Sequence, residues 1–510
     1  MNQMGFPLLS IIVLLPLAGG LLALLLGRNR RTAWAWALLV ALADLALAGV
    51  MWGFFEYGRV GMQFVDRLAW IEPLGIHYQV GIDGVSLWLV LLTALLGAVA
   101  ILASFRFLEG RPAGEAATYL LLLLMLETGA LGVFVATDLI LFFIFWEAML
   151  VPAYLLIGRW GGERRLYAAR KFFLYTMAGS AMMLVAILAL AVLGQEQMGT
   201  LTFDLVALQG LSLDRTAQVL LFIAFGLAFL VKAPLWPLHT WLPVTYVESP
   251  SPVTIVVAGV LSKMGIYGLI RFCLPLFPEA VALLRPWIWA LAIVGILYGS
   301  LLALVQRDLK RLVAYSSLAH MGTIVAGVLA GNVQGVQGAL LLSVSHGLTV
   351  AALFFVVDLL ERRRGTRLLG EFGGLWRSLP LLGTLLLIVI LASAGLPGLS
   401  AFPGEFTLLL GIFQQSTAAA VFATLGIVLG AWYMLSFFRQ AFAGPLDRAE
   451  NRILPDLRWG EAALLLPLVA LIFLVGFLPN LLLRPTDTSV QDLLTRAEEN
   501  RIVLVEETGP

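Results

Sequence analysis

Charged residues are scarce and cysteine is almost absent from this sequence. Lys, Arg, Asp and Glu together make up 12% of 510 residues, 61% are hydrophobic, and the mean hydropathy is +0.96. This composition excludes an ordinary soluble domain and indicates a polytopic membrane protein. The net charge is only +1, and no basic tract with interleaved aromatics is present, so nothing favours nucleic-acid binding.

The single cysteine, Cys273, excludes both a disulfide framework and an iron–sulfur cluster held by several thiolates. The sequence also lacks a dinucleotide-binding fingerprint and a phosphate-binding loop. We therefore expect this chain to bind no redox cofactor and no metal.

Long apolar runs fill the chain, and each can cross a hydrocarbon core of about 30 Å. The first is too long for a signal peptide and lacks a basic leader, so it is expected to be a retained helix. About fourteen spans are predicted, near residues 6–27, 32–55, 83–105, 115–136, 138–158, 167–194, 216–242, 250–273, 283–305, 309–330, 335–360, 378–415, 417–442 and 461–482. The predicted fold is therefore all-α.

Successive loops lie on alternate sides of the membrane in this arrangement, and the basic residues are divided unequally between the two sides. Most lie in loops of one side, at 28–31, 106–111, 159–171, 307–311, 362–377 and 439–458. The opposite loops hold Arg59, Arg67, Arg215, Arg271 and Arg285, and the C-terminal tail adds Arg484, Arg496 and Arg501. The bias predicts both termini on the outer side of a bacterial inner (plasma) membrane. The tail is expected to be a short surface helix against a neighbour or a solvated segment.

Two lysines, Lys232 and Lys263, fall in the middle of spans, although the chain contains only four lysines. Lysine can release a proton at working pH, whereas arginine cannot. Pro234 and Pro237 follow Lys232 and remove the helical hydrogen-bond partners of two carbonyls, those of Leu230 and Ala233. Such a break at bilayer depth needs protein or water around it, so Lys232 is predicted to face a hydrated site.

Other ionisable residues lie at similar depth. The candidate proton-carrying set is Glu147, Lys232, Lys263, His320, His346 and Glu405. Each costs at least about 2.5 kcal/mol at the bilayer centre, so pairing or titration is expected, and Lys232 is expected to hold its proton when paired with Glu147. The alternative is that they are structural hydrogen-bonding groups, and for the histidines that reading is nearly as strong.

Four further polar residues are expected to have supporting roles. Glu127 and Asp44 are predicted to be interhelical hydrogen-bonding groups, and Asp138 is predicted to cap a helix. His239 lies either on an inlet path or in an aromatic-rich interfacial turn, and the sequence leaves both open.

The order of spans indicates an inverted repeat, because spans 4–8 and 9–13 each contain five helices. A shift of 173 residues places Lys232 on Glu405 and Glu147 on His320. The twelfth span, interrupted by Gly395 and Pro397, then matches the broken seventh span. Paired broken helices are typical of ion sites in transporters. The predicted units are an N-terminal three-helix segment (1–112), two five-helix repeats (113–275 and 276–445) and a last helix with its tail (446–510).

Three long motifs carry a resemblance to a known family. They are VKAPLWPLHTWLPVTYVESPSPVTIVVAGVLSKMGIYG (231–268), WEAMLVPAYLLIGRWGG (146–162) and DLKRLVAYSSLAHMG (308–322). The chain resembles, over its whole length, the antiporter-like membrane subunits of respiratory complex I (NADH-quinone oxidoreductase) and the related multi-subunit cation/proton antiporter chains. The glutamate at 405, in place of a lysine, is similar to the M-type chains.

This resemblance implies a proton-translocating subunit with a midplane relay. Glu147 and Lys232 correspond to the family's fifth- and seventh-span residues, Lys263 to its eighth-span lysine, His320 or His346 to a central bridge and Glu405 to the exit-side group. NADH, flavin, iron–sulfur clusters and quinone are implied only for the complex, and the implied partners are its other membrane subunits. The alternatives are a subunit of a sodium/proton antiporter or of a membrane-bound hydrogenase, and a passive structural spacer.

Overall fold

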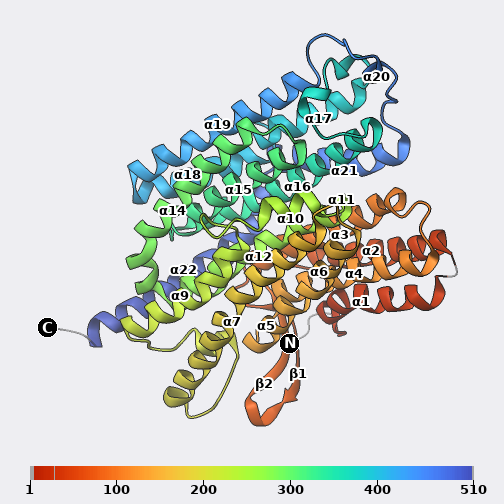
Figure 1. The fold of residues 1–510 in the computed structure, drawn as a ribbon. Helices are drawn as coiled ribbons and strands as arrows, with labels where there is room; N and C mark the ends of the chain where they lie inside the picture. The colour runs from red at the N-terminus through yellow and green to blue at the C-terminus, as the bar shows by residue number, and fades with distance from the viewer. Residues whose placement is uncertain (1–4, 28, 508–510) are drawn as a thin grey trace.

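The computed structural model describes residues 5–27 and 29–507, apart from the side chains of residues 26 and 500–507. Both extreme ends of the chain and Arg28 of the first basic loop therefore lie outside the described residues. The chain folds into a helical bundle whose long helices run side by side (Figure 1). The prediction of an all-helical, multi-pass membrane protein is confirmed.

The first half of the bundle extends from the start of the chain to the end of the eighth span, a helix divided into short segments. Its elements are α1 (Leu8–Leu26), α2 (Arg30–Gly53), β1 (Gln63–Ile71), β2 (Ile76–Ile82), α3 (Gly84–Phe107), α4 (Ala113–Val135), α5 (Leu139–Ala148), α6 (Leu150–Trp160), α7 (Arg165–Met198), α8 (Leu205–Leu208), α9 (Arg215–Lys232), α10 (Leu242–Glu248), α11 (Ser251–Val256), η2 (Val257–Leu261), α12 (Ser262–Gly268), η3 (Leu269–Cys273) and α13 (Leu274–Leu276).

The second half continues with longer helices. They are α14 (Pro278–Val305), α15 (Leu309–Val328), α16 (Val333–Arg364), α17 (Pro380–Ser393), α18 (Ala401–Gln415), α19 (Thr417–Ala441), α20 (Ala449–Arg452), α21 (Trp459–Phe477) and α22 (Asn480–Glu507).

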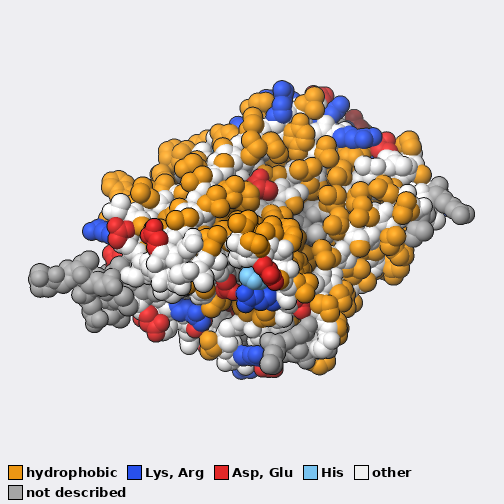
Figure 2. Space-filling view, turned by 90° about the horizontal axis from the view of Figure 1, so that it is seen from below, with side chains coloured by type: hydrophobic (Ala, Val, Ile, Leu, Met, Phe, Trp, Pro, Cys, Tyr) orange, Lys and Arg blue, Asp and Glu red, His pale blue; other side chains and the backbone are white. Residues whose placement is uncertain are grey.

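Twelve segments of the described chain are long and apolar enough to cross a membrane. The other two of the fourteen predicted spans are the more polar helix α15 and the pair α17–α18. The predicted breaks are present: α9 ends at Lys232, and the twelfth span divides between Ser393 and Ala401. Hydrophobic side chains cover most of the face in Figure 2, as lipid contact requires.

The eighth span and α16 form the centre of the bundle. In each of these two segments the apolar membrane-length window is fully buried, whereas only about a third of the corresponding windows of α2 (33%), α19 (33%) and α21 (39%) is buried. The eighth span also contains two π-helical segments, η2 and η3, which the sequence did not predict. A π turn shifts the hydrogen-bond pattern by one residue and often marks a functional site.

A two-stranded hairpin, also not predicted, projects from one end of the bundle (Figure 1). Its strands β1 and β2 are antiparallel, with Asp66 opposite Val80 and irregularities on either side of the regular ladder. Near its turn the hairpin is held by Asp138, whose carboxylate accepts a hydrogen bond from the backbone of His77. The same carboxylate caps α5 through the amides of Ile140 and Leu141, so the predicted capping role is confirmed.

The C-terminal tail is a long helix, α22, that packs against α3, α13, α14 and α16 of the same chain. Ser489 on α22 accepts a hydrogen bond from the amide of Gly84 at the start of α3. Gln337 on α16 donates to Asp487. Of the two readings that the sequence left open, the described part of the tail follows the helical one, and it lies on its own bundle.

Candidate functional site: a buried row of ionisable side chains

Lys232 is the last residue of α9, and its side chain is buried among aromatic rings. Its ammonium nitrogen lies 4.8 Å from the centroid of the Trp146 ring and has no hydrogen-bond partner among the described residues. A cation over an indole face gains electrostatic stabilisation, but an ammonium group also needs hydrogen-bond acceptors. The described residues supply no acceptors for this ammonium group, so the chemistry of the site calls for water molecules as acceptors.

The helix break beside Lys232 is satisfied by protein groups. The carbonyl of Leu230, predicted to lose its partner, accepts from the amide of Leu235. The carbonyl of Val231 accepts from the indole nitrogen of Trp241 at 2.9 Å. The break is thus an ordered element, in which a buried indole replaces part of the lost helical bonding.

Glu147, at the end of α5, was predicted to pair with Lys232. Among the described residues no ion pair joins them within 4.0 Å, the limit that defines such a pair. Glu147 is half-exposed at the flank of the chain, and its Oε1 atom is buried without a hydrogen-bond partner. The two residues are close neighbours, because Glu147 follows Trp146, but the structure shows them unpaired.

Lys263 lies in the eighth span, between its two π segments, and is fully buried. Its nitrogen donates to the carbonyl of Ala258 at 2.7 Å and to the hydroxyl of Ser262 at 3.2 Å. It also lies 2.7 Å from Nδ1 of His346 on α16. Ala258 belongs to the π segment η2, so the altered backbone pattern places a carbonyl next to the ammonium group.

The row continues through two histidines to Glu405. The rings of His346 and His320 have their centroids 5.4 Å apart. His320, on α15, contacts the carbonyl of Ser316 through Nδ1 at 2.9 Å and the carbonyl of Ser393 through Nε2 at 3.1 Å. Its Nε2 lies 4.0 Å from Oε1 of Glu405 on α18. Four predicted residues from four spans therefore form one continuous row.

The break in the twelfth span places the last members of the row. Pro397 has no amide hydrogen, so the carbonyl of Ser393 lacks its helical partner and is available to His320. Gly395 has φ +74, and a Cβ atom there would collide with the carboxylate of Glu405. A glycine is thus required both by the backbone conformation and by the closeness of Glu405.

A small cavity lies beside this part of the row. It measures about 10 Å³, close to the minimum for one water molecule. Its lining includes His320, Ser393, Glu405 and Tyr433. The phenol of Tyr433 on α19 donates to the hydroxyl of Ser316 at 3.0 Å, which ties a further buried polar residue to the row.

The structure leaves Lys232 and Glu147 as a separate group. Sequence reasoning missed the buried hydroxyls of Thr245, Tyr246 and Ser317, which have no hydrogen-bond partner among the described residues. Tyr246 faces Ser317 and Ser262, the residue next to Lys263, without the geometry of a hydrogen bond to either. Hydroxyl residues are common in apolar helices, so only their clustering in three dimensions could identify them.

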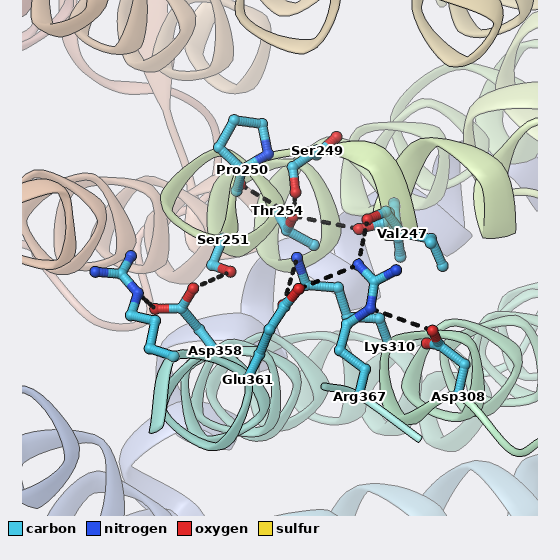
Figure 3. Close-up of polar contacts among 12 residues, drawn as sticks. Val247, Ser249, Pro250, Ser251, Thr254, Asp308, Lys310, Asp358, Glu361 and Arg367 are labelled. Atoms are coloured by element: carbon cyan, nitrogen blue, oxygen red, sulfur yellow. Dashed lines mark hydrogen bonds and ion pairs between the residues drawn. The ribbon is translucent and has the colours of Figure 1, made fainter. Parts of the chain in front are cut away.

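A polar network includes residues from two of the basic loops, 307–311 and 362–377 (Figure 3). Arg367 pairs with Asp308 at 3.2 Å and with Glu361 at 3.6 Å. Lys310 also pairs with Glu361 at 3.6 Å. These two predicted basic loops therefore meet, and carboxylates balance part of their charge.

Supporting roles were also predicted for Asp44, Glu127 and His239. Asp44 on α2 and Glu127 on α4 are buried, but both carboxylate oxygens of Asp44 and Oε1 of Glu127 have no hydrogen-bond partner among the described residues, so the predicted interhelical hydrogen bonds are absent there. Glu127 lies instead against Gly97 of α3, whose missing side chain leaves room for the carboxylate. His239 is buried with its ring centroid 5.4 Å from that of Tyr298, an aromatic contact that fits the interfacial reading.

Comparison with known proteins agrees with the fold. A family model described as "NADH:quinone oxidoreductase/Mrp antiporter, TM" matches residues 136–430, and one described as "NADH-ubiquinone oxidoreductase chain 4, amino terminus" matches residues 62–131. The NADH-quinone oxidoreductase subunit M of Rhodobacter capsulatus is 41% identical over 500 residues, which cover 96% of each chain.

Solved structures show the same architecture. A chain of respiratory complex I from Thermus thermophilus has a TM-score of 0.86 and 34% identity, and the match covers 97% of this chain and 99% of that one. A chain of the Mrp complex from Dietzia sp. shares the fold with a TM-score of 0.83 at 22% identity, covering 98% and 100%. The chain therefore belongs to the antiporter-like membrane subunits of NADH-quinone oxidoreductase, among the relatives named subunit M or chain 4.

Proposed function

We propose that this chain translocates protons across the membrane through Glu147, Lys232, Lys263, His320, His346 and Glu405. The observation that carries the proposal is the continuous row from Lys263 through His346 and His320 to Glu405. Each of the four residues in this row can gain and lose a proton. Along the row, each residue is in direct contact with the next or is separated from it by the width of one water molecule. Structural hydrogen bonding alone does not require four adjoining ionisable groups in the most buried part of a bundle.

The energy for translocation comes from outside this chain. Moving one charge against a membrane potential costs about 2.3 kcal/mol per 100 mV. The sequence offers no site for a redox cofactor, so NADH, flavin, iron–sulfur clusters and quinone belong to other subunits of the enzyme. The coupling reaches this chain through neighbouring membrane subunits. Glu147, half-exposed on the flank next to Trp146 and Lys232, is the member of the set placed to sense such a neighbour.

The architecture that fits this function is a pair of inverted five-helix units, residues 113–275 and 276–445. Supporting this division, both breaks occur at the fourth helix of their unit, after Lys232 in one and before Glu405 in the other. The three helices of 1–112 and the final segment 446–510 flank the pair. The loop charges favour both termini on the outer side of a bacterial plasma membrane.

The test uses the assembled enzyme in proteoliposomes, with proton pumping measured during NADH oxidation. Lys232→Ala and Glu405→Gln are each expected to lower the number of protons moved per NADH oxidised while assembly is retained. Normal pumping in both variants would refute the proposal. Sodium-dependent proton exchange in the absence of NADH would instead support a secondary antiporter.

A further inference from the structure

The acceptors around Lys263 match those of a protonated lysine. An ammonium group has three N–H donors and no acceptor. The hydroxyl of Ser262 donates to the carbonyl of Ala258 at 3.1 Å, so its oxygen is left to accept from Lys263. With the Ala258 carbonyl and Nδ1 of His346, the three donors meet three acceptors. A protonated Lys263 makes this third hydrogen bond only if Nδ1 of His346 carries no proton, and His346 is then neutral.

The acceptors around His320 are of a different kind. Both of its ring nitrogens face backbone carbonyl oxygens, those of Ser316 and Ser393, and a carbonyl can only accept. A neutral imidazole has one donor and one lone pair, so one of its nitrogens would face an oxygen without a hydrogen between them. Both contacts are hydrogen bonds only if the ring is an imidazolium. The carboxylate of Glu405, 4.0 Å from Nε2, supplies the opposite charge.

The second acceptor exists because the twelfth span is broken. In a continuous helix the carbonyl of Ser393 would accept from the amide of residue 397, but Pro397 has none. The break therefore provides the oxygen that receives the Nε2–H group. Pro397 acts through that carbonyl as a positioning residue for His320.

We propose that the row rests with two protons, one on Lys263 and one on His320, on either side of a neutral His346. This inference relies on the proposed proton-translocating function and adds the order of steps. His320 cannot accept a second proton, so release must come before refilling. In the release step the Nε2–H bond of His320 breaks and an O–H bond forms on Glu405, leaving a neutral imidazole and a carboxylic acid. One water in the adjoining cavity bridges the 4.0 Å gap.

Refilling then follows from the other side. The ammonium group of Lys263 gives a proton to Nδ1 of His346, which passes one from its ring to the vacated His320. Once Nε2 has lost its proton, its lone pair faces a lone pair of the Ser393 carbonyl oxygen, and the two repel each other. This contact therefore opposes proton release until the helix break shifts. The titratable groups facing His320 are thus Glu405, His346 and Lys263, with Tyr433 one hydroxyl away through Ser316.

The first test compares His320→Lys with His320→Gln in the assembled enzyme. Lysine restores a cation with donors for both carbonyls, whereas glutamine is neutral and has donors at only one atom. Proton transfer through this chain is expected to fall at least roughly a hundredfold in His320→Gln, which removes a proton-transfer group, so that fewer protons are pumped per NADH, and to be at least partly rescued in His320→Lys. Equal loss in both variants would overturn the inference.

The second test reads the protonation directly. The enzyme is labelled with ¹⁵N-histidine, and the His320 signals are identified as those missing from His320→Gln. At neutral pH both ring nitrogens of His320 are expected to carry protons. In Pro397→Ala, where the new amide competes for the Ser393 carbonyl, one of them is expected to lose its proton. The control is Pro403→Ala, because residue 403 lies in the first turn of α18, where an amide has no helical partner.

A ring nitrogen of His320 without a proton in the unaltered enzyme would overturn this inference. Identical spectra of Pro397→Ala and Pro403→Ala would also overturn it. Neither result touches the proposed function, which fails only if Lys232→Ala and Glu405→Gln pump normally. The two hypotheses can therefore fail separately.

Discussion

The ammonium nitrogen of Lys263 lies 2.7 Å from Nδ1 of His346, and this contact joins the two most buried segments of the bundle. Lys263→Arg keeps a positive charge at the site but cannot release a proton. We expect proton transfer through this chain to fall at least roughly a hundredfold, the lower range for a lost proton-transfer group, and the protons pumped per NADH to fall by the share that this chain carries. The variant enzyme should still assemble, as measured by native gel electrophoresis.

The matched control for this substitution is Lys310→Arg. Lys310 is also buried, but it pairs with Glu361 among the basic loops, away from the row (Figure 3). Arginine can replace it in that ion pair, so pumping should be unchanged. Equal pumping by the two variants would show that Lys263 serves only as a cation.

Gly395→Ala should disturb the exit end of the row. The new Cβ would meet the carboxylate of Glu405, and the backbone conformation with φ +74 would be strained by about 1 kcal/mol in addition. Gly444→Ala separates the two effects, because Gly444 has φ +90 with open space around it. We expect pumping to fall in Gly395→Ala and to stay normal in Gly444→Ala. A similar loss in both would assign the effect to backbone strain.

Trp241→Phe should weaken the break next to Lys232. The substitution removes the indole donor to the Val231 carbonyl and leaves that buried oxygen unsatisfied, at a cost of about 1–3 kcal/mol. A lower melting temperature of the purified complex is expected. Trp287→Phe is the control, since Trp287 is 72% exposed. An unchanged melting temperature in Trp241→Phe would mean that the break is held by other groups.

Arg271→Gln should destabilise the end of the bundle near the hairpin. Arg271 forms a buried ion pair with Asp83, the residue that caps α3. Removing one partner leaves an uncompensated buried charge and costs about 3–5 kcal/mol. Arg59→Gln, which breaks an exposed pair with Glu56, should cost about 0–1 kcal/mol. Protease sensitivity near residue 83 would report the difference, and equal sensitivity of the two variants would contradict it.

Much of the fold could be predicted because apolar length and proline chemistry are properties of the sequence itself. The fourteen predicted spans and both breaks correspond to helices and breaks in the structure. The six proposed proton carriers stand out because ionisable groups are rare at membrane depth. Their roles remain predictions, but the structure does bring four of them into one row.

Other features depend on neighbours and were not predictable. The π segments flank Lys263 in a mostly apolar span, and its glycines do not by themselves mark a change of hydrogen-bond spacing. The hairpin was hidden because β1 and β2 lie in a short connection between two strong helical signals. The expected ion pair between Lys232 and Glu147 is absent because pairing depends on a few ångströms of side-chain placement, which spacing along a helix cannot supply.

The two helix breaks have a chemical consequence. Around His320, the groups that orient the ring are backbone carbonyls, and one of them is available because of a proline. A carbonyl oxygen accepts a hydrogen bond but does not become protonated near neutral pH. The scaffold that aims the relay therefore keeps its own charge constant while protons pass along it.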